Sequence, residues 1–263
     1  MVPSPERGNP EKQANQSEEI DPTTYSPLAP SSERPHQVGK VPLYKYPIVS
    51  WGDGTYVQLS SEKIEAAAVE QVVARMLKGI LPVSDVVHDP HPRLDVYYSK
   101  KMPLSSIEKK TSPEEIAADI ALFRFLFGDA DHALHSDFTT HDGESRNIIY
   151  KNERVVYFDF EMARRGFFGS RDVQQILKTC SPSTRSHLEH KLALLTERFG
   201  GADGRRFLEA IIESTGKNIA LLFLDKEANA GPVTFDRFYN TFLQKLHEMS
   251  DAMGQRVLAE KAA

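Results

Sequence analysis

Three polar residues in the middle of the chain, Asp137, Asn147 and Asp159, are flanked by short apolar segments. Asn147 precedes the apolar residues 148–150, and Asp159 follows the apolar run 155–158. Phosphoryl transfer needs a carboxylate that orients and deprotonates the attacking hydroxyl, and an Asn and an Asp that hold Mg²⁺ on the nucleotide phosphates. A single Asp in a loop is more often a turn residue or a helix cap. The order of the three residues and the strands beside them nevertheless predict one kinase-type site, with Asp137 as base and Asn147 and Asp159 as metal ligands.

The spacing of these residues leaves two candidates for the base. Nine residues separate Asp137 from Asn147, whereas the kinase catalytic loop has four residues between its Asp and its Asn. Asp142 does have four residues before Asn147. We favour Asp137 because it follows the apolar residues 133–134 and has His135 two positions before it. The segment between Asp137 and Asn147 is then an insertion that must loop out.

Composition and charge limit the classes of function. The formal net charge of -5 at pH 7 argues against nucleic acid as the main partner, because phosphate binding calls for a broad basic face. The single cysteine, Cys180, cannot form an intramolecular disulfide, and no apolar run approaches the length that spans a membrane. No secretory signal is recognisable at the start of the sequence. The expected location is therefore cytoplasmic or nuclear.

The elements that must position the site divide the chain into a tail and two lobes. Residues 1–40 are rich in Pro, Ser, Glu, Gln and Asn, which predicts a disordered tail. Residues 41–110 are typical of a small strand-rich lobe with one hairpin, one helix at about 60–78 and two further strands at 80–87 and 94–98. Residues 111–263 begin with a helix at 112–127 and become mainly helical after the strands of the site. The predicted fold class is α+β.

Apolar residues at helical spacing mark two further helices in the last third of the chain. One stripe contains Leu188, Leu192, Leu195 and Phe199, and the other contains Phe235, Phe238, Phe242, Leu246 and Met249. An aromatic stripe at this spacing belongs far more often to a core than to a ligand site, so we assign no chemistry to it.

Residues 41–178 resemble the protein-kinase-like superfamily, and specifically its aminoglycoside phosphotransferase and choline kinase branch. The resemblance is carried by His135 and Asp137 as H-x-D, by Asn147, by Asp159-Phe160-Glu161 as D-[FWY]-E, and by the later Asp172. It implies a two-lobed kinase-like fold that binds ATP and Mg²⁺. It also implies that His135 is structural and holds the catalytic loop by hydrogen bonds.

In the small lobe the resemblance is weaker. Glu65, in the sequence Glu-Ala-Ala-Ala, takes the place of the helix Glu that pairs with the nucleotide-binding Lys, although a solvated helix residue would look the same. Matching residues 48–52 to the family's V-V-K-[FY]-G puts Ser50 in the Lys position. Either Lys45 or Lys63 then reaches the phosphates, or nucleotide binding is impaired. Gly52 and Gly54 are candidates for the approach to the phosphates, although a plain hairpin turn is the favoured interpretation of these two residues taken alone.

The function expected from these features is an ATP- and Mg²⁺-dependent phosphotransferase that acts on a hydroxyl of a small molecule. The alternative is a weak or inactive pseudokinase that binds a nucleotide or a protein partner, which the Ser in place of Lys and the inserted loop favour. Protein-kinase activity ranks lower because no A-P-E motif follows Asp159. Metal-dependent hydrolysis by His135, His141 and Asp137 ranks lower still, since no H-E-x-x-H helix or Cys pair accompanies them.

Overall fold

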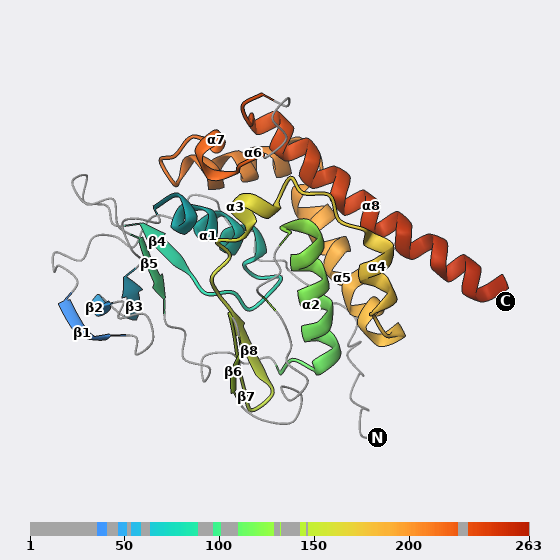
Figure 1. Ribbon diagram of the computed structural model, residues 1–263, viewed down its shortest axis with the longest axis horizontal. Helices are drawn as coiled ribbons and strands as arrows, with labels where there is room; N and C mark the ends of the chain where they lie inside the picture. Colours follow the sequence, from blue (N-terminus) through green and yellow to red (C-terminus); the bar gives the residue numbers. More distant parts are fainter. Residues whose placement is uncertain are drawn as a thin grey trace, which may run out of the picture.

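The protein combines antiparallel strands with a larger set of helices, so the predicted α+β class is confirmed (Figure 1). The computed structural model describes residues 36–40, 47–51, 54–58, 64–88, 97–100, 110–128, 132, 143–145, 147–225 and 231–262. The larger of the two sheets has five strands and lies on one side of the molecule, and most helices of the second half of the chain lie on the other (Figure 1).

The five-stranded sheet has the order β1-β2-β3-β5-β4, and all its neighbouring strands are antiparallel. Its strands are β1 (His36–Lys40), β2 (Pro47–Trp51), β3 (Gly54–Gln58), β4 (Val86–His88) and β5 (Tyr97–Lys100). The pairing of Trp51 with Gly54 confirms the predicted hairpin. Ser50 lies in β2, opposite Thr55 of β3.

The predicted tail extends too far along the chain. Residues 36–40 form β1, and their backbone pairs with β2, for example His36 with Ser50 and Lys40 with Pro47. A prediction from composition averages over forty positions, so it misses a short edge strand whose support is the ladder of a neighbouring strand. The rest of that segment, residues 1–35, lies outside the described residues.

Helix α1 (Ile64–Leu77) lies between β3 and β4 in the chain and is buried along most of its length. Its Ala and Val residues allow close packing, and Figure 1 shows it beside α3, α6 and α7. The strand predicted at 80–87 is mostly absent, because β4 begins only at Val86. Residues 82–84 instead bond to Tyr157, with Tyr157 N donating to Pro82 O and Ser84 N donating to Tyr157 O, each at 2.9 Å.

A second, three-stranded sheet carries the predicted site. It consists of β6 (Gly143–Ser145), β7 (Ile148–Lys151) and β8 (Arg154–Tyr157), in that order. The pairing of Ile148 with Tyr157 and of Lys151 with Arg154 makes β7 and β8 a tight hairpin, as their sequences predict. The inserted segment before Asn147 does not simply loop out, because its residues 143–145 pair with β7.

Helix α2 (Pro113–Leu126) begins where its sequence predicts. Ser112 caps it: the Ser112 hydroxyl accepts from Glu115 N at 3.2 Å, and Glu115 Oε2 accepts from Ser112 N at 3.0 Å. This reciprocal capping box, with Pro113 at the first turn, satisfies backbone donors that the helix itself leaves unpaired. Ile116, Ile120 and Phe123 are buried on its inner face.

The remaining helices are α3 (Ala163–Gly166), α4 (Val173–Lys178), α5 (Pro182–Phe199), α6 (Gly201–Glu213), α7 (Ile219–Leu222) and α8 (Phe235–Ala262). Both predicted apolar stripes are core, since Leu188, Phe199, Phe238 and Phe242 are all fully buried. The rings of Phe199 and Phe242 meet edge to face with centroids 5.2 Å apart. Among the described helices, none is both long enough and apolar enough to cross a membrane.

Lys245 of α8 is a cation buried against the ends of two other helices. Its Nζ donates to Phe125 O at 3.4 Å and Leu126 O at 3.3 Å, and also to Phe167 O. Carbonyl groups at helix C-termini lack partners within their own helices, so an ammonium there satisfies them. Burial lowers the pKa of Lys245 to about 8, and the charge of Arg171 acts in the same direction.

This shift predicts a pH dependence of stability. The folded pKa lies below the ordinary value of 10.5, so the unfolded chain binds more protons between about pH 8 and 10.5, and stability rises with pH in that window. Relative to Lys245→Met, the wild type should gain about 2 kcal/mol in free energy of unfolding between pH 7 and 9.5. Urea unfolding at the two pH values measures this, and an unchanged difference between the two proteins would contradict it.

Candidate functional site

The β7–β8 hairpin brings together two of the three residues predicted to form the site. Asn147 and Asp159 lie just beyond the paired residues Ile148 and Tyr157. Phe158 N donates to Asn147 O at 3.1 Å, and Asn147 Nδ2 donates to Asp159 O at 3.2 Å. The register of one hairpin therefore makes them neighbours, as expected from the two strands in the sequence.

Both residues have left-handed backbone conformations, with φ of 61° at Asn147 and 60° at Asp159. For Asn147 a turn accounts for this: Ser145 pairs with Ile148, so Asn147 belongs to the tight turn between β6 and β7, where Asn is favoured at positive φ. Asp159 has no such hairpin turn. A non-glycine residue held in this region costs on the order of 1–3 kcal/mol, so the surroundings must hold it there.

The surroundings of Asp159 come from two other parts of the chain. Asp159 N donates to Glu70 Oε1 of α1 at 3.0 Å. Phe158 O lies 3.0 Å from His132 Nε2, and because a carbonyl only accepts, this ring nitrogen carries the hydrogen. His132 is fully buried, and its ring stacks on Phe160 with centroids 4.8 Å apart. Residues 158–160 are thus held by α1, by His132 and by Asn147.

Glu65 occupies a different place from Glu70. Its Oε2 lies 4.0 Å from Arg164 Nη2, and its side chain is 40% exposed, so the pair contributes little stability. Glu65 and Glu70 are five residues apart, which corresponds to about 140° of rotation and about 7.5 Å of rise along a helix. The two side chains therefore reach different neighbours. Of the two glutamates, the structure brings Glu70 to the Asp159 segment and Glu65 to Arg164 of α3.

The other predicted residues are placed as follows. Asp172 caps α4, its Oδ1 accepting from Gln174 N at 2.9 Å and Gln175 N at 3.1 Å. Gly54 begins β3 and Ser50 lies in β2. The catalytic candidates His135, Asp137 and Asp142, together with Gly52, lie outside the described residues.

The donor set around Asn147 and Asp159 suits Mg²⁺ in its usual form. Within the described ranges no group of three or more His, Cys, Asp or Glu residues could hold a metal ion. Mg²⁺ bound to a nucleotide does not need such a cage, because it keeps several waters and takes phosphate oxygens with only one or two protein carboxylates. One carboxylate and one amide oxygen, from Asp159 and Asn147, fit that pattern.

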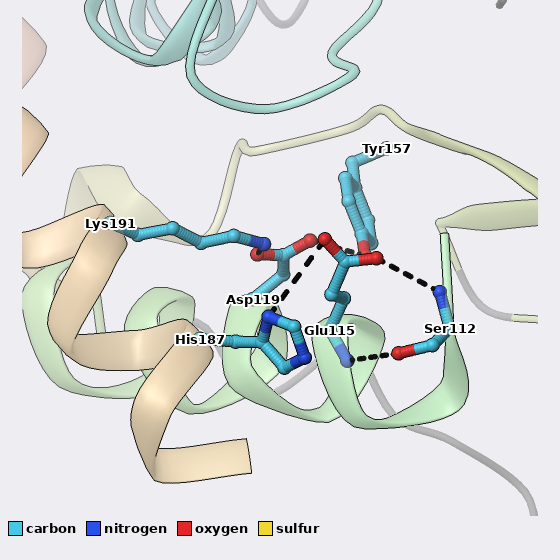
Figure 2. Close-up of polar contacts among 6 residues, drawn as sticks. All are labelled: Ser112, Glu115, Asp119, Tyr157, His187 and Lys191. Atoms are coloured by element: carbon cyan, nitrogen blue, oxygen red, sulfur yellow. Dashed lines mark hydrogen bonds and ion pairs between the residues drawn. The ribbon is translucent and has the colours of Figure 1, made fainter. Parts of the chain in front are cut away.

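A buried polar cluster supports the strand that leads to Asp159 (Figure 2). Tyr157 of β8 donates to Asp119 Oδ2 at 2.8 Å, and Lys191 Nζ of α5 donates to Asp119 Oδ1. Asp119 and Tyr157 are fully buried, and Lys191 is 6% exposed. Burial raises the pKa of Asp119 against the opposing charge of Lys191, and burial together with Asp119 raises the pKa of the Tyr157 hydroxyl.

The rim of this cluster is more open. His187 Nδ1 lies 3.9 Å from Glu115 Oε1, and Glu115 in turn closes the capping box with Ser112 (Figure 2). Ser112 caps α2, Glu115 lies in its first turn and Asp119 lies near its middle, whereas His187 and Lys191 come from α5. The cluster therefore joins β8 to both helices.

Sequence reasoning missed Glu70, His132, Asp119 and Lys191. For three of them a signal exists: Asp119 and Lys191 interrupt apolar stripes of their helices, and Glu70 stands among Val and Ala residues of α1. A charged side chain at such a position must be paired in the core. His132 carries no local signal, because its partner lies far along the chain in Phe158.

Comparison of the chain with protein families, curated proteins and solved structures finds no family model, no curated protein and no solved structure that matches it.

Proposed function

We propose that the chain is an ATP- and Mg²⁺-dependent phosphotransferase of the two-lobed kinase-like type, which transfers a phosphoryl group to a hydroxyl of a small molecule. The observation that carries the proposal is the direct contact of Asn147 with Asp159, at 3.2 Å between Asn147 Nδ2 and Asp159 O. These are the residue types, in the right chain order, that hold Mg²⁺ on nucleotide phosphates.

The arrangement of elements around the pair also supports it. The five-stranded sheet has a helix, α1, between its third and fourth strands, and α1 reaches Asp159 through Glu70. In protein kinases, too, a glutamate on one helix beside the strands takes part in the active site, where it pairs with the phosphate-binding Lys. The remaining α helices would form the second lobe and contribute the acceptor site.

Each residue of the proposed site has a role. Asp137 accepts the proton of the acceptor hydroxyl, and His135 holds the loop that carries Asp137. Asn147 and Asp159 bind Mg²⁺, which neutralises charge on the phosphates when bound. Ser50, Gly52, Gly54 and Glu65 line the approach to the nucleotide.

Thermal unfolding with ATP and Mg²⁺, separately and together, tests the proposal. Both together, at about 100 times the Kd, should raise the Tm by about 5–10 °C. Asp159→Ala should lose the part of this shift that depends on Mg²⁺, because the carboxylate ligand is gone. Asp203→Ala, which removes an exposed carboxylate of α6, is the matched control and should keep it. An Asp159→Ala protein that folds and responds to Mg²⁺ like the wild type would refute the metal-ligand role.

A pseudokinase is the second candidate, and one observation favours it. The described strands β2 and β3, which precede α1, contain no Lys, whereas kinases carry the phosphate-binding Lys on the strand before this helix. A neutral hydroxyl at Ser50 does not replace an ammonium electrostatically. A protein of this kind would bind nucleotide weakly or not at all and would show no turnover.

A further inference from the structure

We propose that Glu70 is a positioning residue that sets the direction of the metal ligand Asp159 by holding the backbone N–H of Asp159. The inference rests on the proposed function, since it assigns Glu70 a part in Mg²⁺ binding. The contact that carries the inference is a hydrogen bond from the backbone amide of Asp159 to Glu70 Oε1.

The burial of Glu70 requires such a partner. Glu70 is only 5% exposed, and its neighbours on the same side of α1 are Ala and Val residues. A buried carboxylate is costly unless hydrogen bonds satisfy it, and a bond from a backbone N–H to an ionised carboxylate is roughly twice as strong as one between neutral groups. The bond from Asp159 N, at 3.0 Å, is one such hydrogen bond.

Two peptide planes flank Asp159, and both are held. The plane between Phe158 and Asp159 is held at its carbonyl by His132 and at its N–H by Glu70, each at 3.0 Å. The next plane is held at Asp159 O by Asn147 Nδ2, at 3.2 Å. The φ and ψ angles of Asp159 describe the relation between these planes, so holding both planes fixes the direction of its Cα–Cβ bond.

The positive φ of Asp159 makes this support necessary. At φ of 60° the backbone is strained, and without its bond to Glu70 the peptide loses one of the hydrogen bonds that hold it and turns more readily toward an ordinary conformation. Such a turn would change the direction of the Asp159 carboxylate relative to Asn147. Metal ligands must be held within about 0.5 Å and 10–20° of their working geometry, so the metal site would weaken.

Two substitutions of Glu70 distinguish its role as a hydrogen-bond acceptor from the effect of its negative charge. Glu70→Gln keeps an oxygen that accepts from Asp159 N and should leave the Mg²⁺ requirement for ATP binding nearly unchanged. Glu70→Met removes the acceptor and should raise the Mg²⁺ concentration for half-maximal stabilisation by ATP about tenfold or more, as is typical when support of a metal ligand is lost. Gln71→Met, a polar-to-apolar change at the next buried position of α1, is the control and should have no such effect.

Amide hydrogen exchange at Asp159, without any nucleotide, gives a second readout. The Asp159 amide should exchange slowly in the wild type and in Glu70→Gln, and fast in Glu70→Met. Fast exchange in the wild type would overturn the proposal even if Glu70→Met did not fold. Equal loss of the Mg²⁺ response in Glu70→Gln and Glu70→Met would also overturn it, in favour of a role for charge.

The two hypotheses fail in different ways. If the wild type responds to ATP with Mg²⁺ and Glu70→Met responds identically, the positioning role is wrong and the phosphotransferase proposal stands. If the wild type shows no Mg²⁺-dependent response to ATP, both are wrong, whatever the amide exchange shows of the hydrogen bond itself.

Discussion

Replacing Asp137 by Asn should lower phosphotransfer to a small-molecule hydroxyl by about 10²–10⁴-fold, the range typical of a positioned acid–base group. Asn keeps the size and much of the hydrogen bonding of Asp but cannot accept the proton of the acceptor. The affinity for ATP and Mg²⁺ should therefore stay close to that of the wild type. The measurement is turnover of ATP with amino-alcohol, sugar and aminoglycoside acceptors, together with the thermal shift caused by the nucleotide.

Asp142→Asn is the matched control, and it also tests the register of the loop. Asp142 directly precedes β6, whose Gly143 pairs with Tyr150, three residues beyond Asn147. At about 3.3 Å per residue this puts Gly143 about 10 Å along the ladder from the turn at Asn147. Asp142→Asn should then change turnover little. If the two variants exchange their effects, Asp142 is the base.

A third outcome would favour the pseudokinase. If wild type stays at background with every acceptor and neither variant changes ATP hydrolysis, the enzyme hypothesis is wrong. Ser50→Lys then gives a direct check of the missing cation. Gain of nucleotide affinity in this variant would show that position 50 of β2 faces the phosphates.

The parts of the fold that could be predicted are those whose signals are local. The capping box at Ser112 and the helical spacing of Ile116, Ile120 and Phe123 define α2 without reference to the rest of the chain. The prediction of the tail boundary at about residue 40 was wrong because β1 has no local signal and depends on pairing with β2. The prediction of a strand at 80–87 was wrong over most of its length for the same reason. Residues 82–84 bond to a single residue of β8, its last residue Tyr157, and do not form a continuous ladder with that strand.

The candidate site also combines contacts that follow from local sequence with contacts that depend on distant packing. The contact of Asn147 with Asp159 follows from a hairpin whose two strands are adjacent in sequence, so spacing alone predicts it. The choice between Glu65 and Glu70 depends on how α1 is rotated against the Asp159 segment. That rotation is set by packing of α1 on distant helices, which no local pattern encodes.

The buried pair of Asp119 and Lys191 should have the largest effect on stability. Lys191→Met should lower the free energy of unfolding by about 3–5 kcal/mol, because it leaves the fully buried Asp119 carboxylate without its cation. Tyr157→Phe removes only the neutral donor and should cost about 1–3 kcal/mol. Urea unfolding at pH 7 measures both values.

The double variant Asp119→Leu/Lys191→Met distinguishes the cost of one unpaired buried charge from the net contribution of the ion pair to the free energy of unfolding. The double variant replaces both buried ions next to Tyr157 by apolar side chains, and such replacements are often neutral or stabilising. The double variant should therefore be clearly more stable than Lys191→Met alone. Because Tyr157 would still lose its acceptor, we expect a remaining cost of about 1–3 kcal/mol, which Tyr157→Phe in the same background should relieve. If the double variant is as unstable as Lys191→Met, the pair itself holds β8 against α2 and α5, and the strand that ends at Asp159 depends on it.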